Sequence, residues 1–234
     1  MSTTPPTEPP YTPPPPPEAP PAVDPIPWEK PGYPALEGLY ETIKLFVVNP
    51  SEGFARMPIA GDLVKPLLFT VILGWVGVIV SNIYSLALRG ALWNYLPGMS
   101  GMGRDQFMLS TGTTVAMMIF APVLVLIGVF IWAGIVHLFL MLVGGATSGF
   151  TATLRVVCYT QTTQLAQIVP ACGGLISFIW SLVLSISGLA IAHRTTQGKA
   201  ALAVLLPVVL CCVCLVIVIA MTGAGIAALV SGSR

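Results

Sequence analysis

Residues 115–142, VAMMIFAPVLVLIGVFIWAGIVHLFLML, decide the fold class, because they are apolar almost throughout and include no acidic residue and no lysine. A helix needs about 20 such residues to cross the hydrocarbon core of a bilayer. The stretch is longer than this, so it predicts a membrane-spanning helix that is tilted or is kinked at Pro122. No aspartate or glutamate occurs from residue 106 to residue 234, so the chain on the C-terminal side is equally suited to lipid.

The same criterion predicts four further spans: residues 66–88, 151–168, 175–192 and a segment within 202–230. The composition agrees, since 8% of the residues are charged, against about 25% in soluble proteins. The net charge of +1 gives no reason to expect nucleic acid as a partner. We therefore expect an all-α membrane protein with five transmembrane helices in a domain of residues 63–230, with the lipid bilayer as its surroundings.

The N-terminal segment has a different composition. Of the 22 prolines, 15 lie within residues 1–34. Such a segment predicts a disordered, proline-rich cytoplasmic tail with polyproline character. The tail is expected to be a spacer or a ligand for protein partners, because it contains P-x-x-P patterns. On either interpretation, deletion of residues 2–30 is expected to leave insertion and stability unchanged.

Residues 35–62 predict an interfacial segment before the first span. Apolar residues recur there at spacings of three and four, with charged residues on the other side, which is typical of an amphipathic helix lying on a membrane. The apolar side consists of Leu36, Leu39, Ile43 and Phe46. Asn49-Pro50 ends this helix, because a residue before proline avoids helical backbone angles.

Basic residues predict the orientation in the membrane. Seven of the ten lie on one side of the five predicted spans: Lys30, Lys44, Arg56, Lys65, Arg155, Arg194 and Lys199. Because basic residues are enriched on the cytoplasmic side, we expect a cytoplasmic N-terminus and an external C-terminus. Residues 89–113 are then an external loop, with a short helix resting on the outer surface.

Few residues in the spans carry chemistry. His137 has only Cys158 or His193 as potential partners for a metal, and otherwise serves to hydrogen-bond neighbouring helices. In the third span one broad side carries Thr153, Thr160, Thr163, Gln164 and Gln167. These residues line a solvated cavity or join helices through hydrogen bonds. Arg155 is expected to extend to the cytoplasmic interface.

Small residues form a stripe on the fourth span at spacings of three and four: Gly174, Ser177, Ser181, Ser185 and Gly188. Small residues let helix backbones approach closely, so the stripe predicts a packing face, either within the bundle or between two copies in a homo-oligomer. Cys211 and Cys214 have C-x-x-C spacing within an apolar helix and no second ligand pair, so we expect them to pack against lipid or protein. No metal, cofactor or catalytic residue is predicted.

Taken together, these motifs resemble the Yip family, the Ypt/Rab-interacting membrane proteins. The resemblance rests on VVNPSEGFARMP at residues 47–58, on Asp62-Leu63-Val64-Lys65-Pro66, which is similar to the family's D-L-Y-G-P, and on His137 with Gly144-Gly145. It continues through the stretch from Tyr159 to Pro170 and through HRTTQGKAALAVLLP at residues 193–207. The resemblance implies a five-helix bundle with no known catalysis and no cofactor. Val64, Lys65 and Cys158 depart from the eukaryotic motifs and suggest a prokaryotic member, located in a bacterial inner membrane.

Two functions agree with these features. The first is a non-enzymatic scaffold or adaptor that organises partners or membranes, or acts in trafficking. The alternative is a transporter or permease for small molecules or lipids that uses the polar third span. An intramembrane enzyme is disfavoured, because the spans contain no acid and no pairing of a nucleophile with a base.

Overall fold

The computed structural model describes residues 24–95 and 104–232, with the side chains of residues 24–88 and 111–222. Within these residues every regular element is a helix. Four helices are long and apolar enough to cross a membrane: Val64–Leu88, Thr111–Leu142, Gly173–Ala192 and Gln197–Thr222. They belong to α3 (Val64–Tyr95), α4 (Arg104–Leu142), α6 (Gly173–Ala192) and α7 (Gln197–Gly232). The predicted class, an all-helical membrane protein, is confirmed.

The predicted third span is α5 (Gly149–Thr160) followed directly by the 3-10 helix η3 (Gln161–Ile168). The hydroxyl of Thr162 donates to the carbonyl of Tyr159 at 2.9 Å, and that of Thr163 donates to the carbonyl of Thr160 at 2.9 Å. Side-chain donors of this kind compete with the backbone for helix carbonyls. This element is shorter and more polar than the four long helices, so its complete crossing of the membrane stays a prediction.

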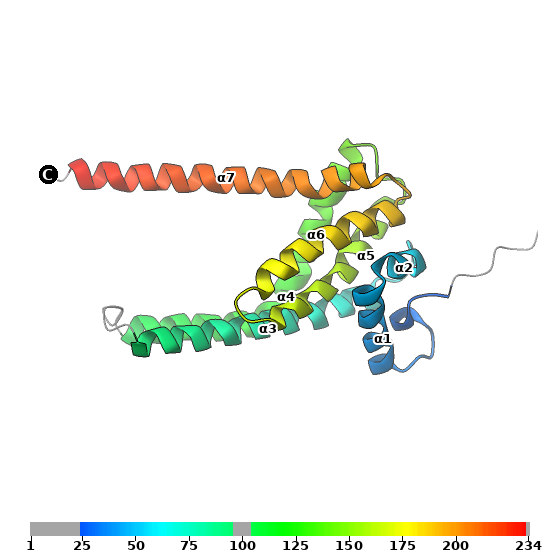
Figure 1. The fold of residues 1–234 in the computed structure, drawn as a ribbon, viewed down its shortest axis with the longest axis horizontal. Helices are drawn as coiled ribbons and strands as arrows, with labels where there is room; N and C mark the ends of the chain where they lie inside the picture. The colour runs from blue at the N-terminus through cyan, green and yellow to red at the C-terminus, as the bar shows by residue number, and fades with distance from the viewer. Residues whose placement is uncertain (1–23, 96–103, 233–234) are drawn as a thin grey trace, which may run out of the picture.

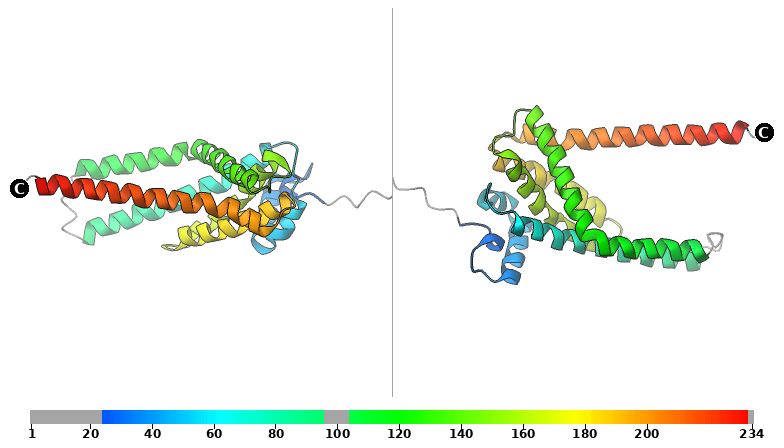
Figure 2. Two further views of the ribbon diagram at one scale, coloured as in Figure 1. Left: turned by 90° about the horizontal axis from the view of Figure 1, so that it is seen from above. Right: turned by 180° about the vertical axis from the view of Figure 1, so that it is seen from behind.

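Successive helices run in opposite directions. In Figures 1 and 2, α3, α5–η3 and α7 run away from the end that holds α1 and α2, and α4 and α6 run back toward it. Helix α4 is bent (Figure 2) and contains Pro122. A proline inside a helix removes one hydrogen bond and kinks the backbone, as the sequence predicted.

The predicted external loop at residues 89–113 is wrong in most of its length. Helix α3 continues to Tyr95 and α4 begins at Arg104, so only residues 96–103 separate them, and these lie outside the described part. The two helices pack closely: the Trp75 indole donates to the Met118 carbonyl at 2.9 Å, and Val125 lies where a side chain on Gly74 would stand. Both helices therefore extend beyond the spans that hydropathy predicts, and they pack against each other in the part whose side chains are described.

We name residues 24–62 the platform. They contain η1 (Pro27–Glu29), α1 (Ala35–Val48) and α2 (Pro50–Arg56), and α1 lies across the direction of the long helices (Figure 1). Phe46 of α1 packs edge to face against Phe54 of α2 and stacks on Tyr159 of α5, with ring centroids 4.9 and 5.1 Å apart. The helix predicted at this place is present. Of its predicted membrane-facing side, Leu36 is 83% exposed, whereas Phe46 is buried in the protein core.

Residues 1–34 were predicted to be a disordered tail, and this prediction is wrong for residues 24–34. Ile26 and Trp28 are buried in the same core as Phe46. The backbone N–H of Trp28 donates to the Thr42 hydroxyl at 2.9 Å, and its indole donates to the Lys65 carbonyl at 2.6 Å. Residues 1–23 of the predicted tail lie outside the described residues.

Candidate functional site

Arg155, in the second turn of α5, is the largest fully buried side chain of the described residues, with 1% exposure. One of its terminal nitrogens lies 2.7 and 2.9 Å from the two carboxylate oxygens of Glu29, and the other donates to the Asp62 carbonyl. Its Nε has no hydrogen-bond partner. The extension of Arg155 to the cytoplasmic interface stays a prediction. Within the protein its guanidinium is buried and is paired with Glu29 of the platform.

Glu29 is the centre of this buried polar cluster. It also accepts a hydrogen bond from the Tyr159 hydroxyl at 2.5 Å, and its side chain is only 11% exposed. A buried charge is tolerated when it is paired and hydrogen-bonded. The cluster thus ties η1, the turn before α3, and α5 to one another by charge as well as by apolar packing.

A second polar cluster joins α4, α5 and the end of α6. Thr153 lies between two histidines: its hydroxyl oxygen is 2.8 Å from His137 Nδ1 and 2.9 Å from His193 Nε2. The Ser148 N–H donates to His193 Nδ1 at 3.1 Å, so the neutral ring carries its proton on Nε2 and donates to Thr153. The Thr153 hydroxyl then donates to His137. Burial, and secondarily the neighbouring His137, lower the pKa of His193 to about 4.

The polar side of the third span divides between packing and cavities. Thr160 is buried and donates to the Val156 carbonyl at 2.8 Å. Gln164 lines two cavities together with Gln161, and Gln167 lines another near the far end of η3. The structure thus brings Thr160 and Gln164 to one cavity and separates Gln167 from them.

The small-residue stripe packs within the chain over part of its length. Ser177, Ser185 and Gly188 are buried. A Cβ on Gly188 would lie 2.7 Å from the Phe54 ring and from Val156, so this glycine lets α2 and α5 approach α6. Those three residues pack inside one chain, and oligomerisation stays a prediction. The cysteines of the C-x-x-C pattern, Cys211 and Cys214, are free thiols exposed on α7.

The residues of the family-like motifs lie at the end of the helix bundle that holds the platform. The Asp62 carboxylate accepts the Val64 N–H at 3.1 Å at the start of α3, Pro66 occupies the first turn, and Leu63 packs beside α4 and α5. Gly144 has φ of 65°, a conformation that favours glycine. Its carbonyl accepts from the Lys199 ammonium at 3.0 Å, and Leu140 lies against Gly145. These residues shape turns and helix starts.

Both polar clusters join helices to one another through hydrogen bonds. The described residues contain no group of three or more His, Cys, Asp or Glu side chains placed to hold a metal ion. Both histidines of the second cluster contact Thr153, and no carboxylate is hydrogen-bonded to either within the described part of the chain. A threonine between two histidines lacks the orienting acid of a catalytic triad.

Glu29 and Trp28 are residues of this site that sequence reasoning missed. The signal for both was an Ile-Pro-Trp-Glu sequence within a proline-rich segment, at residues 26–29. Apolar and aromatic residues are rare in segments that remain unfolded. A charged Arg155 in a span also requires a partner, and the only acids available lie in the N-terminal half of the chain.

A comparison with protein families finds a match over most of the chain. A family model described as the Yip1 domain matches residues 43–219, from the middle of α1 to the outer part of α7. The match includes the buried Arg155, Thr153 and both histidines, and it leaves out residues 24–42. No curated protein and no solved structure is significantly similar to the chain.

Proposed function

Because the chain belongs to the Yip1 domain family, we propose that it is a non-enzymatic scaffold that organises partners or lipid at one face of a membrane. The single observation that carries this proposal is the insertion of Glu29 between Arg155 and Tyr159. This contact, more than 120 residues apart in the sequence, fixes the platform to the bundle. A fixed platform presents one surface, which is what a scaffold requires.

The platform is held at several independent points. Phe54 of α2 lies against Gly188 of α6 and against Phe46 of α1. Trp28 is hydrogen-bonded at its backbone and at its indole. Asn49 caps α2 by accepting the Glu52 N–H at 3.4 Å. These contacts order helices that are individually too short to be stable in water.

The outer surface of α1 is suited to a membrane interface or to a partner. Leu36, Tyr40 and Val47 are 83%, 65% and 46% exposed. With Ile43 they recur at spacings of four, three and four, so they share one flank of the helix. Glu37 and Lys44 lie on a different side. A helix with an exposed apolar flank and a charged side lies in the plane of the interface.

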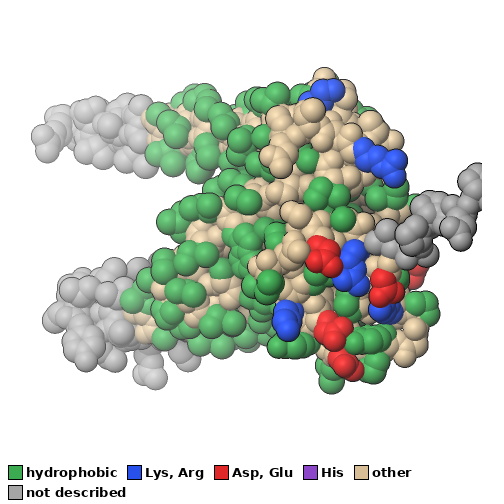
Figure 3. All heavy atoms as spheres, turned by 45° about the vertical axis from the view of Figure 1, so that its right-hand side comes forward, with side chains coloured by type: hydrophobic (Ala, Val, Ile, Leu, Met, Phe, Trp, Pro, Cys, Tyr) green, Lys and Arg blue, Asp and Glu red, His purple; other side chains and the backbone are tan. Residues whose placement is uncertain are grey.

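Charge distribution supports a cytoplasmic platform. Lys, Arg, Asp and Glu side chains gather at the platform end in Figure 3, and apolar side chains cover the arms that extend from it. Basic residues are enriched on the cytoplasmic side of membrane proteins. With five crossings, including α5–η3, the C-terminus is external. A bacterial inner membrane is the proposed location.

Reporter fusions at residues 30, 100 and 234 test this orientation. We expect cytoplasmic, external and external readings. A cytoplasmic reading at residue 234 means an even number of crossings, with α5–η3 re-entering on the side from which it came, and contradicts the five-span proposal.

The scaffold role is tested by changing the exposed flank of α1 in the full-length protein. Replacing Leu36, Tyr40 and Val47 by serine leaves the core contacts intact, so the unfolding midpoint should not change. Crosslinking in the native membrane should lose the neighbours that the unchanged protein captures through α1. The matched control, Glu37→Gln with Lys44→Gln, should retain them. The scaffold proposal is contradicted if the serine variant captures the same neighbours as the unchanged protein and if the protein also carries a solute across liposome membranes in a way that requires the polar third span. That pair of results favours the transporter.

A further inference from the structure

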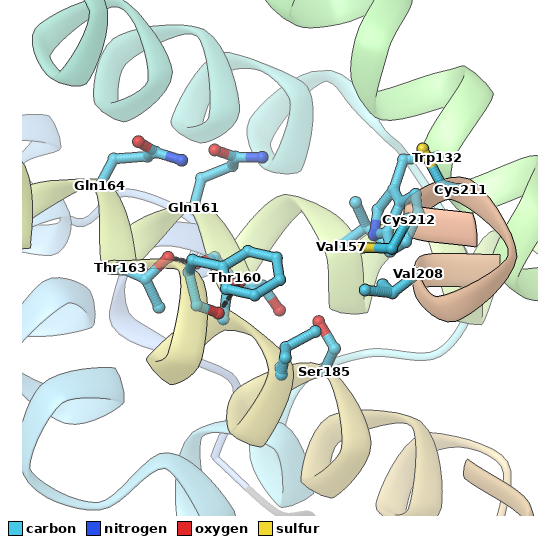
Figure 4. A pocket seen from close by; sticks show the side chains of 13 residues that line it. Trp132, Val157, Thr160, Gln161, Thr163, Gln164, Ser185, Val208, Cys211 and Cys212 are labelled. Atoms are coloured by element: carbon cyan, nitrogen blue, oxygen red, sulfur yellow. Dashed lines mark hydrogen bonds between the residues drawn. The ribbon is translucent and has the colours of Figure 1, made fainter. Parts of the chain in front are cut away.

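A cavity of about 410 Å³ lies among the middle portions of α4, α5–η3, α6 and α7. In Figure 4, Gln161 and Gln164 stand on one side of it, and Trp132, Cys211 and Cys212 on the other. The remaining walls include Phe178, Leu182 and Val208, which are apolar. Its volume falls within the range of about 300–1,000 Å³ that is typical of ligand sites.

Four polar groups in the wall of this cavity have no hydrogen-bond partner in the described part of the chain, and one of them is the hydroxyl of the buried Ser185. The side-chain amides of Gln161 and Gln164 and the indole N–H of Trp132 make no hydrogen bond to any described residue, and all three side chains are half-buried. In a bilayer interior there is no bulk water to satisfy such groups, and each unsatisfied group costs several kcal/mol. A ligand that offers carbonyl or hydroxyl oxygens at this depth removes that cost.

The unpaired amides are held in place by packing. A Cβ on Gly77 of α3 would lie 2.9 Å from Gln164 Oε1, so the glycine makes room for this side chain. A second cavity of about 230 Å³ adjoins α3 and α4, and it shares Trp132, Val157, Gln161 and Gln164 with the first. These four residues therefore lie between the two cavities, and their side chains can contact a ligand in either one.

Charge selects the kind of ligand. Not one of the 13 residues that line the larger cavity is acidic, basic or a histidine. A phosphate head would lose its hydration here without gaining a counter-charge, which is strongly unfavourable. An uncharged head with hydroxyl and ester oxygens matches two amides and an N–H donor.

Access to the cavity is from the side. Toward its C-terminus α7 separates from the other helices (Figure 1), and Figure 3 shows the molecule hollowed between this arm and its neighbours. Val209, Leu210 and Val213 of α7 are each at least half exposed. Acyl chains can therefore leave the cavity between α6 and α7 into the surrounding bilayer.

We propose that this cavity holds the head of a neutral glycerolipid of the diacylglycerol class. Gln161 and Gln164 bond its hydroxyl and ester oxygens, Trp132 donates to one of them, and the acyl chains lie along α7. The proposal stands apart from the scaffold role, because no platform residue lines the cavity.

Two photoactivatable lipids test it in liposomes of phosphatidylcholine containing the full-length protein. One probe is a diacylglycerol and the other a phosphatidylcholine, both with the same diazirine-bearing acyl chain, so that they differ only in the head. We expect the diacylglycerol probe to label residues 208–213 of α7, to be competed by unlabelled dioleoylglycerol, and to exceed the phosphatidylcholine probe there.

The variants compare glutamines of the same 3-10 helix. Loss of about 1 kcal/mol for each hydrogen bond predicts a fall of more than about ten-fold in labelling for Gln161→Leu/Gln164→Leu. Gln167→Leu, whose side chain lines a different cavity, should label as the unchanged protein does. Trp132→Phe keeps the aromatic ring and should lower labelling about five-fold. It carries the test if the double variant does not fold, as judged by thermal unfolding.

Equal labelling by the two probes, or labelling that neither the glutamine nor the tryptophan variants reduce, overturns the proposal. Either result assigns the labelled lipid to the general annulus around α7.

Discussion

In α7, Ala203 and Val204 are fully buried, whereas Val213 and Val216 of the same helix are 50% and 65% exposed. The amino-acid composition hardly changes along this helix. What changes is the surroundings, since the first turns pack against α4 and α6 beside the platform, and the remainder extends alone (Figure 1). The comparison shows that the platform end is a closed protein core, whereas the opposite end relies on lipid to cover its apolar surface.

The closed end also holds the buried polar clusters. Arg155, Glu29, Thr153 and His193 all lie there, each with at least one hydrogen-bond partner. At the open end the unpaired amides of η3 face cavities. Buried polar groups require exact partners, and a core assembled from several elements can supply them. Helices that diverge, as they do at the open end, cannot supply such partners.

The largest expected effect is at the buried ion pair. Arg155→Leu leaves the Glu29 carboxylate buried without its partner, which should lower the free energy of unfolding by about 3–5 kcal/mol. Thermal unfolding of the full-length protein in detergent measures the loss. The double variant Arg155→Leu/Glu29→Leu should recover most of it, because replacing both charges by apolar groups is often neutral.

The control for this prediction is the exposed ion pair of Lys30 with Asp24, whose atoms are 2.6 Å apart. Lys30 lowers the pKa of Asp24 through this hydrogen bond. Because both side chains reach solvent, Asp24→Asn should leave the unfolding midpoint unchanged. An equal loss of stability for Asp24→Asn and Arg155→Leu would mean that burial does not set the contribution of these two ion pairs.

A smaller loss is expected where α2 meets α6. Gly188→Ala places a Cβ 2.7 Å from the Phe54 ring, and such overpacking should cost about 1–3 kcal/mol. Gly134→Ala, in α4, meets no atom within 4 Å. It should stabilise its helix by about 0.5–1 kcal/mol. The opposite signs are measured by thermal unfolding of the two variants, and a neutral Gly188→Ala contradicts the close approach.

Acidification should weaken the closed end through His193. Its pKa of about 4 in the folded protein lies below the ordinary value of 6.5, so the unfolded chain binds the proton more tightly. Stability from the neutral ring is complete above about pH 6.5 and should decline by on the order of 1–2 kcal/mol as the pH falls toward 4. His193→Asn keeps an acceptor for the Ser148 N–H and should remove this component of the pH dependence. An unchanged profile in that variant assigns the transition to other groups.

The smallest effect is expected at Val216, in a pair of substitutions that tests the comparison within α7 directly. Val204→Ala removes two methyl groups from a fully packed site and should cost about 2 kcal/mol. The same substitution at Val216 changes a lipid-facing side chain, so the unfolding free energy should change by less than about 0.5 kcal/mol. If the two losses are equal, the outer half of α7 is packed against protein, and a second copy of the chain is the natural candidate.

Hydropathy alone predicted some features of the fold correctly, because the preference of each side chain for lipid or water does not depend on its neighbours in space. An apolar run such as 175–192 must avoid water wherever its neighbours lie, and α6 coincides with it closely. Pro122 bends its helix for an equally local reason, and Asn49-Pro50 ends α1 as predicted. Phe46 of the predicted membrane-facing side packs against Phe54 and Tyr159 instead, because helical periodicity identifies a face but not what that face contacts.

The partners of polar residues depended on distant parts of the chain. Glu29 and Arg155 are separated by 126 positions, and neither position carries a local signal of the other. The ends of α3 and α4 were missed because hydropathy identifies the apolar part of a helix and not the more polar turns that continue it.

The sequence by itself determined that the protein is a helical membrane protein of the Yip1 domain family and where the apolar parts of its long helices lie, because solvation and local backbone preferences act residue by residue. Only the tertiary structure decided that residues 24–34 fold onto the bundle, that Arg155 is buried, and that Gln161 and Gln164 face a cavity. These outcomes depend on which side chains converge in space, and such convergence follows from the packing of whole helices.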